Sequence, residues 1–293
     1  MKYRNYYEMI KAVQPDRVAL IEDGRIYTYG DIIRQADVVS DRYKGILAGS
    51  PEKNICTGNS EKNVAAELGS VIILENDICL IVKDTVALEL VYFIGIMKAG
   101  KVPVICGGYP DNEELDTIKS IEVPHGAVMG VMTSGTTGSS KVLFRTMESW
   151  ADYFPVQNKL FSMGGDTVLF THGSLSFTGN LNLYMGLMHD GGRIVTTRKF
   201  DPRYWAKCID ENYVNYIYLI PVKMMALVKS YSKAGGQADN ICNAAIKHYI
   251  TGSQSFGAEE AARVKRIFPE CDMLVYYGAS EINYITYLTD REF

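Results

Sequence analysis

The chain has 293 residues, a hydrophobic content of 47% and a formal net charge of −4 at pH 7. A chain of this length and composition can bury a sizeable core, either as one large domain or as two modest ones. Because the charge is mildly acidic and no long basic run occurs, we do not expect nucleic acid or an anionic membrane as the main partner.

The cysteines and the N-terminal residues indicate the cellular compartment. The six cysteines are scattered, without a Cys-x-x-Cys pair or a histidine at metal-ligand spacing, so we expect reduced, structural thiols. The first ten residues do not resemble a signal peptide, and no run approaches the roughly 20 apolar residues that span a bilayer. We therefore expect a cytoplasmic protein.

The first part of the chain alternates between short apolar runs and helical patterns. Residues 18–21 predict a strand, and Asp23-Gly24 predicts a hairpin turn into the alternating residues 26–29. The apolar run at 78–82 predicts a buried strand, and residues 87–99 predict a helix packed behind it. This alternation is typical of an α/β protein with a parallel sheet.

A loop rich in hydroxyl groups and glycine follows, Thr133-Ser134-Gly135-Thr136-Thr137-Gly138-Ser139-Ser140-Lys141. Glycine lets successive backbone N–H groups point at one oxyanion, the hydroxyls add neutral donors, and Lys141 adds a mobile positive charge. The spacing is not that of a Walker loop, because Ser140-Lys141-Val142 lacks the second glycine and the metal-binding hydroxyl. The residues alone leave two interpretations open, a phosphate loop and a polar surface turn.

Further strands and helices are predicted beyond this loop. The strands are 168–170, 191–195, 216–220, 248–252 and 273–276, and the helices are 181–188, 222–231 and 258–268. In the last helix, Ala262, Val264, Ile267 and Phe268 form the predicted apolar side.

The last predicted strand leads into Tyr277-Gly278-Ala279-Ser280-Glu281. These residues supply a ring that can stack on a purine, a glycine for close backbone approach, a hydroxyl for phosphate and a carboxylate for a hard cation. Ligands of open α/β sheets bind beyond the carboxyl ends of the strands, where we expect this motif and the Thr133–Lys141 loop to lie.

Both motifs resemble signatures of one family. Thr-Ser-Gly-Thr-Thr-Gly-x-x-Lys at 133–141 resembles the phosphate loop of adenylate-forming enzymes: acyl-CoA and aryl-CoA synthetases, luciferases and peptide-synthetase adenylation domains. Tyr277-Gly278-Ala279-Ser280-Glu281 resembles that family's Tyr-Gly-x-Thr-Glu, and segments 27–31 and 96–110 resemble two earlier signatures in the same order. On this order and spacing the chain is identified as a member of the family.

The resemblance implies an α/β fold with two packed mixed or parallel sheets flanked by helices (αβαβα), an incomplete N-terminal AMP-binding domain. It implies two interleaved lobes, one of about residues 78–165 and one of about 1–77 with 166–293. The family's ribose-binding aspartate, hinge and small C-terminal domain, which carries the adenylation-promoting lysine, have no counterpart in this sequence. Ser140 and Val142 also depart from a common proline and a common glycine.

The resemblance also implies roles for individual residues, with ATP and Mg²⁺ as cofactors. Lys141 and Glu281 are implied as catalytic residues, and Glu281 as the Mg²⁺ ligand. Catalysis of this kind depends largely on positioning and charge stabilisation. The implied nucleotide-binding residues are Thr133, Ser134, Gly135, Thr136, Thr137, Gly138, Gly252, Ser253, Gln254, Tyr277, Gly278 and Ser280.

His172, Phe177 and Thr178 are implied to line the pocket of the acid substrate. Amino-acid-activating relatives carry an aspartate at the position of Thr178, where it holds the substrate's ammonium group. Because a buried ammonium without such a partner costs several kcal/mol, we expect a fatty, aryl or other acid without the usual α-ammonium. The acid would become an acyl-adenylate and then pass to a thiol, such as CoA or a carrier protein. Alternatively, Thr178 is a helix N-cap.

Three alternatives remain open for this half-length sequence: a fragment of a complete ligase, one half of a split enzyme, or a natural short relative. The chain's last strand is expected to expose apolar surface, which favours a C-terminal partner chain or a homo-oligomer. The competing hypothesis is a non-catalytic nucleotide-binding or scaffold protein that needs a partner chain, since a fold does not entail an activity. A hydrolase is disfavoured because no Gly-x-Ser-x-Gly motif occurs.

Overall fold

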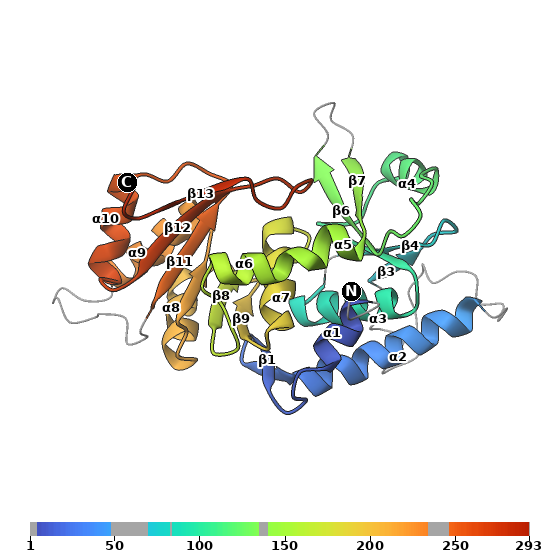
Figure 1. Ribbon diagram of the computed structural model, residues 1–293, viewed down its shortest axis with the longest axis horizontal. Helices are drawn as coiled ribbons and strands as arrows, with labels where there is room; N and C mark the ends of the chain where they lie inside the picture. The colour runs from blue at the N-terminus through green and yellow to red at the C-terminus, as the bar shows by residue number, and fades with distance from the viewer. Residues whose placement is uncertain (1–4, 48–69, 83, 135–139, 234–245, 293) are drawn as a thin grey trace. The chain divides into compact units, whose positions relative to one another are not determined.

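The computed structural model describes residues 5–47, 70–82, 84–134, 140–233 and 246–292 (Figure 1). The chain divides into two compact units. The first comprises Met1–Arg17, Tyr27–Phe154 and Ser174–Leu181, and the second Val18–Ile26, Pro155–Gly173 and Asn182–Phe293. Helix α2 (Tyr29–Leu47) packs along α3 (Val86–Lys98) within the first unit.

The first unit is built on a five-stranded sheet of order β3-β4-β5-β6-β7. Its strands are β3 (Val71–Ile73), β4 (Ile78–Ile81), β5 (Val102–Ile105), β6 (Met129–Ser134) and β7 (Ser140–Arg145). The strands β4, β5 and β6 are parallel, and β3 and β7 are antiparallel edge strands. Every residue of β4 and β5 is buried, which explains their continuous apolar runs.

The helices of the first unit pack on this sheet or on one another. They are α1 (Tyr6–Lys11), α2, α3, α4 (Asn112–Lys119) and α5 (Met147–Trp150), with a 3-10 turn at Ala151–Tyr153. An aromatic cluster joins the chain's N-terminal helix to the segment after β7, because Trp150 lies 5.6 Å from Tyr6 and 5.1 Å from Phe154 between ring centroids. Ile118 of α4 packs in a separate apolar cluster with Leu80 and Val104 of the sheet.

The second unit is built on an eight-stranded sheet of order β13-β12-β11-β10-β8-β9-β1-β2. Its strands are β1 (Val18–Glu22), β2 (Arg25–Thr28), β8 (Val168–His172), β9 (Arg193–Thr197), β10 (Tyr216–Tyr218), β11 (His248–Gly252), β12 (Asp272–Tyr277) and β13 (Thr286–Thr289). The six strands from β12 to β1 are parallel, and β13 is antiparallel. The hairpin turn at Asp23-Gly24 is confirmed, with φ values of 50° and 81°.

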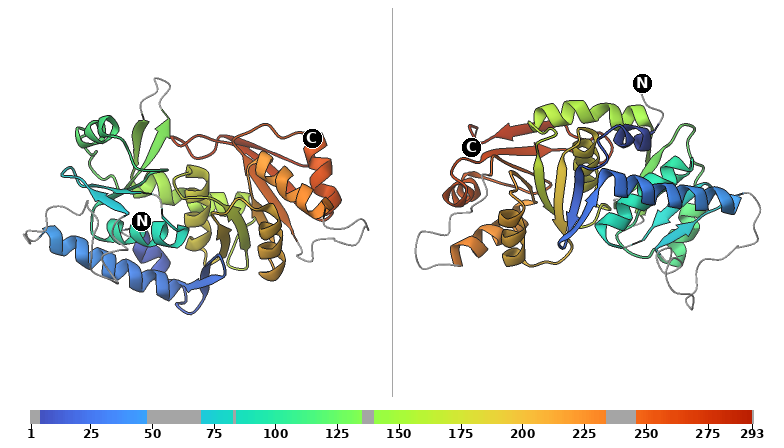
Figure 2. Two further views of the ribbon diagram at one scale, coloured as in Figure 1. Left: turned by 180° about the vertical axis from the view of Figure 1, so that it is seen from behind. Right: turned by 90° about the horizontal axis from the view of Figure 1, so that it is seen from below.

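The helices α6 (Phe154–Leu160), α7 (Thr178–His189), α8 (Pro202–Glu211), α9 (Pro221–Lys233) and α10 (Ala258–Ile267) follow in chain order. The last three lie side by side against the eight-stranded sheet (Figures 1 and 2). In α10 the predicted apolar side is wrong at Ala262, which is exposed, while Ala261 and Val264 are buried.

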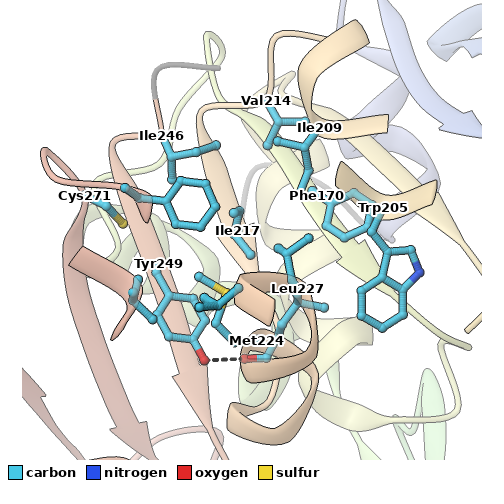
Figure 3. Close-up of a cluster of buried hydrophobic side chains, with 14 of the residues drawn as sticks. Phe170, Trp205, Ile209, Val214, Ile217, Met224, Leu227, Ile246, Tyr249 and Cys271 are labelled. Carbon is cyan, nitrogen blue, oxygen red and sulfur yellow. Dashed lines mark hydrogen bonds between the residues drawn. The ribbon is translucent and has the colours of Figure 1, made fainter. Parts of the chain in front are cut away.

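The core of the second unit lies between α8, α9, α10 and the sheet. Trp205 packs beside Phe170, and Leu227 and Tyr249 belong to the same cluster (Figure 3). The Tyr249 hydroxyl donates to the carbonyl oxygen of Leu219 at 3.0 Å, so this polar group is satisfied within the core. The predicted fold class, α/β with two mixed sheets flanked by helices, is confirmed.

Candidate functional site

The phosphate-loop motif lies on a β-hairpin of the first unit. The register pairs Thr133 with Lys141 across the antiparallel strands β6 and β7, and Ser134 with Ser140. The Thr133 hydroxyl donates to the carbonyl oxygen of Lys141 at 3.4 Å, and the Lys141 side chain is exposed. The hairpin thus brings Thr133 and Lys141 together at the carboxyl end of β6. The predicted ligands Gly135, Thr136, Thr137 and Gly138 lie outside the described residues.

The second motif begins at the carboxyl end of β12. Tyr277 is the last residue of that strand, its side chain is 64% exposed, and its carbonyl oxygen accepts a hydrogen bond from the backbone N–H of Ile285 at 2.7 Å. A side chain at Gly278 would place its Cβ 2.1 Å from the carbonyl oxygen of Asn283. The close backbone approach that requires glycine here is therefore made by the chain itself.

The predicted adenine residues come together with this motif. Gly252, which ends β11, pairs in register with Tyr276 of β12. Ser253 follows with φ of 68°, a left-handed conformation that is uncommon for a non-glycine residue and is often found at functional sites. A pocket of about 610 Å³ is lined by Ser253, Gln254, Ser255, Val275, Tyr276, Tyr277, Gly278, Thr286, Tyr287 and Leu288. Its volume is typical of small-molecule sites.

One wall of this pocket comes from a strand that the sequence analysis did not predict. Thr286, Tyr287 and Leu288 belong to β13, which pairs antiparallel with β12. In the sequence, this strand is marked only by a short run of β-branched and aromatic residues. Such residues are typical of a strand, but the run is too short to predict one. The hydroxyl groups of Tyr276 on β12 and Tyr218 on β10 lie 2.9 Å apart, across the intervening strand β11.

His172, expected in the acid pocket, ends β8 in the second unit and is 9% exposed. Its ring lies 4.6 Å from that of Trp205 and 5.9 Å from that of Phe200, measured between centroids. Burial, and then the nearby ammonium of Lys223, lower the pKa of His172 to about 4. The imidazole is therefore neutral at pH 7.

Phe177 and Thr178, the other two residues expected in the acid pocket, belong to the first unit. Phe177 is 40% exposed. Thr178 is the first residue of α7 and so lies just inside the helix, one position beyond a cap.

A buried carboxylate that the sequence analysis overlooked fixes the loop before Phe177. Glu89 of α3 is fully buried and accepts hydrogen bonds from the Ser174 hydroxyl and the Leu175 N–H, each at 2.8 Å. The amide of Asn180 also donates to the Ser174 carbonyl oxygen at 3.0 Å. In the sequence, Glu89 is an acidic residue within an otherwise apolar helix. This could have indicated a buried carboxylate with hydrogen-bond donors around it, because a buried charge requires such partners.

The described residues do not form a metal centre by themselves. Among them, no three His, Cys, Asp or Glu side chains gather as a metal-binding group. Mg²⁺ is commonly held by only one or two carboxylates, with water and substrate phosphates as its other ligands. Glu281, exposed in the turn after β12, fits such a site, in which bound phosphate completes the coordination.

A pocket beyond the carboxyl ends of parallel strands, lined by an aromatic side chain and hydroxyl groups, is typical of nucleotide-binding α/β proteins. The family model described as AMP-binding enzyme matches residues 110–292, more than half of the chain. The chain belongs to this family of adenylate-forming enzymes.

Two relatives and one solved structure illustrate the similarity. VraA of Staphylococcus epidermidis, which carries the name of a long chain fatty acid-CoA ligase, is 20% identical over 298 residues, covering 93% of this chain and 58% of VraA. YhfT of Bacillus subtilis, named as an acyl-CoA ligase, is 22% identical over 207 residues, covering 69% of this chain and 41% of YhfT. This chain thus spans about half the length of the curated relatives it matches.

The solved structure is the nonribosomal peptide synthetase FmoA3 in its AMPPNP-bound form. It matches with a TM-score of 0.73 and 14% identity, covering 98% of this chain and 33% of FmoA3. This likeness shows the fold, which is that of the N-terminal part of adenylate-forming enzymes. Among the described residues, no helix combines the length and the apolar character needed to cross a membrane.

Proposed function

We propose that this chain carries the nucleotide site and the acid site of an AMP-forming carboxylic acid ligase. In this reaction a carboxylate oxygen bonds to the α-phosphorus of ATP, the bond to the bridging oxygen breaks, and pyrophosphate leaves. The resulting acyl-adenylate then passes its acyl group to a thiol. The observation that carries the proposal is the pocket of about 610 Å³ where Ser253 and Gln254 meet Tyr277 and Gly278.

The nucleotide-binding roles follow from the chemistry of the side chains. The exposed Tyr277 ring offers a face on which adenine stacks, and Ser253 and Gln254 at the pocket rim offer hydrogen-bonding groups. Thr133 and Lys141, paired across the hairpin, offer a hydroxyl and an ammonium to the phosphates. Gly135, Thr136, Thr137 and Gly138 complete the proposed phosphate loop, and Ser280 adds a hydroxyl after β12.

Glu281 would hold Mg²⁺ together with the nucleotide phosphates. When bound, the ion neutralises charge on the phosphate oxygens. The chain's own contribution is to orient the reacting groups: Lys141 holds the phosphates, and the pocket wall made by Tyr277 and Tyr287 fixes the base.

The substrate is proposed to be a carboxylic acid without the usual α-ammonium group. The names of VraA and YhfT, both those of acyl-CoA ligases, support a fatty or other acyl substrate and CoA as the thiol, with a carrier protein as the alternative acceptor. The threonine at position 178 supports the exclusion of ordinary amino acids, because it cannot balance an ammonium charge. We place the reaction in the cytoplasm.

A second candidate is a nucleotide-binding protein that is inactive without a partner chain. It is favoured by the exposed apolar side chains Tyr287 and Leu288 on the edge strand β13. Exposed apolar edges are typical protein-binding surfaces. The partner would be a polypeptide equivalent to the relatives' C-terminal part, or a second copy of this chain.

The nucleotide site is tested by thermal unfolding of the purified chain with and without Mg-ATP. We expect Mg-ATP at about 100 times its dissociation constant to stabilise the wild type by about 2.7 kcal/mol. The Lys141→Ala, Glu281→Ala double variant should lose this stabilisation, because both side chains are exposed and serve the ligand rather than the core. A shift of equal size in the double variant, or none in the wild type, contradicts the assignment.

A further inference from the structure

Lys223, on the first turn of α9, lies among residues assigned to both proposed subsites. Its ammonium donates a hydrogen bond to the carbonyl oxygen of His172 at 3.2 Å, at the carboxyl end of β8. The preceding residue, Val222, donates its backbone N–H to the Oε1 atom of Gln254 at 3.3 Å. Two consecutive residues thus contact one residue of the proposed acid pocket and one residue of the nucleotide pocket.

The charge of Lys223 has no carboxylate partner among the residues that the structure describes. Its ammonium has three donors, and one of them is used by the His172 carbonyl. Burial alone lowers the pKa of Lys223, without a contribution from any acidic side chain, and the imidazole of His172 is neutral at pH 7. A half-buried ammonium that has further N–H donors and no counter-charge favours the binding of an anion.

We propose that Lys223 forms an anion subsite that selects acids carrying a second anionic group, such as a dicarboxylic acid. One carboxylate of the acid is activated, and the distal carboxylate pairs with the ammonium of Lys223. This inference rests on the proposed function, because it assigns the acid pocket beside His172. A half-buried ammonium without a counter-charge has a desolvation cost in free energy. This cost is relieved when an acid with a distal carboxylate binds, and it remains when an uncharged acyl chain binds.

The test compares two stable mimics of an acyl-adenylate with chains of equal length. One is a 5′-O-sulfamoyl adenosine carrying a butanoyl group, and the other carries a succinyl group whose distal carboxylate is free. Affinities are measured by calorimetry at fixed ionic strength for the wild type, Lys223→Met and Lys223→Arg. Lys229→Met is the matched control, because Lys229 lies on the same helix and is exposed.

We expect the wild type to bind the succinyl mimic about tenfold more tightly than the butanoyl mimic, or better, since tenfold corresponds to about 1.4 kcal/mol. Lys223→Met should lose the preference and keep its affinity for the butanoyl mimic. Lys223→Arg should keep most of the preference, because it retains the charge, and Lys229→Met should resemble the wild type.

The outcomes separate this inference from the function on which it rests. Equal affinity of the wild type for the two mimics, or an unchanged preference in Lys223→Met, overturns the anion subsite alone and leaves Lys223 as a structural partner of the His172 carbonyl. If neither mimic binds and Mg-ATP gives no thermal shift, the proposed function fails and the anion subsite fails with it.

Discussion

The Trp205→Ala variant is expected to lose about 3–5 kcal/mol of unfolding free energy. Trp205 is fully buried, and its ring lies 5.1 Å from that of Phe200 and 4.6 Å from that of His172 between centroids. Its indole N–H also donates to the carbonyl oxygen of Lys199 at 2.8 Å. The substitution removes this hydrogen bond and opens a cavity in the core that supports β8. Urea unfolding, monitored by circular dichroism, measures the change.

Tyr213→Ala is the control for Trp205→Ala, because Tyr213 is 81% exposed. Tyr213 has φ of 53°, but tyrosine and alanine both carry a Cβ, so the backbone strain is similar in the two proteins. We expect a change within about 0.5 kcal/mol. If Trp205→Ala changed the free energy of unfolding as little as this control does, the packing around Trp205 would be contradicted.

The Gly278→Val variant is expected to lose both stability and the response to nucleotide. A Cβ at this position meets the carbonyl oxygen of Asn283 at 2.1 Å and the Cα of Tyr284 at 3.0 Å. Because both neighbours are backbone atoms, the turn after β12 has to move. Overpacking of this kind lowers the free energy of unfolding by about 1–3 kcal/mol. The displaced turn should also shift the pocket wall made by Tyr277. Thermal unfolding with and without Mg-ATP measures both effects.

Gly164→Ala is the matched glycine control. It lies in the same unit, and a Cβ there meets no atom within 4 Å, so stability and the nucleotide response should stay at wild-type levels. A normal response to Mg-ATP in Gly278→Val would show that the turn after β12 does not shape the nucleotide site.

The buried parallel strands could be predicted because their sequences are continuous apolar runs. β4 and β10 lie where residues 78–82 and 216–220 predicted them. Helix α4 was not predicted, because its residues Asn112–Lys119 are mostly polar and Ile118 is its one buried side chain. Its boundaries depend instead on Asp111, whose side chain caps the helix by accepting from the N–H of Glu114 at 2.8 Å.

The residues that line the pocket beside Tyr277 could be predicted in part. Gly252, Ser253 and Tyr277 lie at or just after the carboxyl ends of β11 and β12. Because these two strands are parallel neighbours, their carboxyl ends lie side by side, and this could be expected from the order of the strands in the sequence. The contributions of Tyr287 and Lys223 could not be predicted. Tyr287 reaches the pocket through an antiparallel return of the chain, and Lys223 acquires its role only when α9 places it beside the His172 carbonyl.

Acid-dependent release of pyrophosphate from Mg-ATP is the direct test of the proposed ligase activity. The purified chain is assayed alone and with the C-terminal part of VraA supplied in trans, against fatty, aryl and dicarboxylic acids. We expect release that requires both ATP and an acid and that Lys141→Ala lowers by at least about tenfold, as for loss of a charge-stabilising group. If ATP stabilises the chain but no acid elicits pyrophosphate under either condition, the proposed ligase activity is contradicted, and the non-catalytic nucleotide-binding function takes its place.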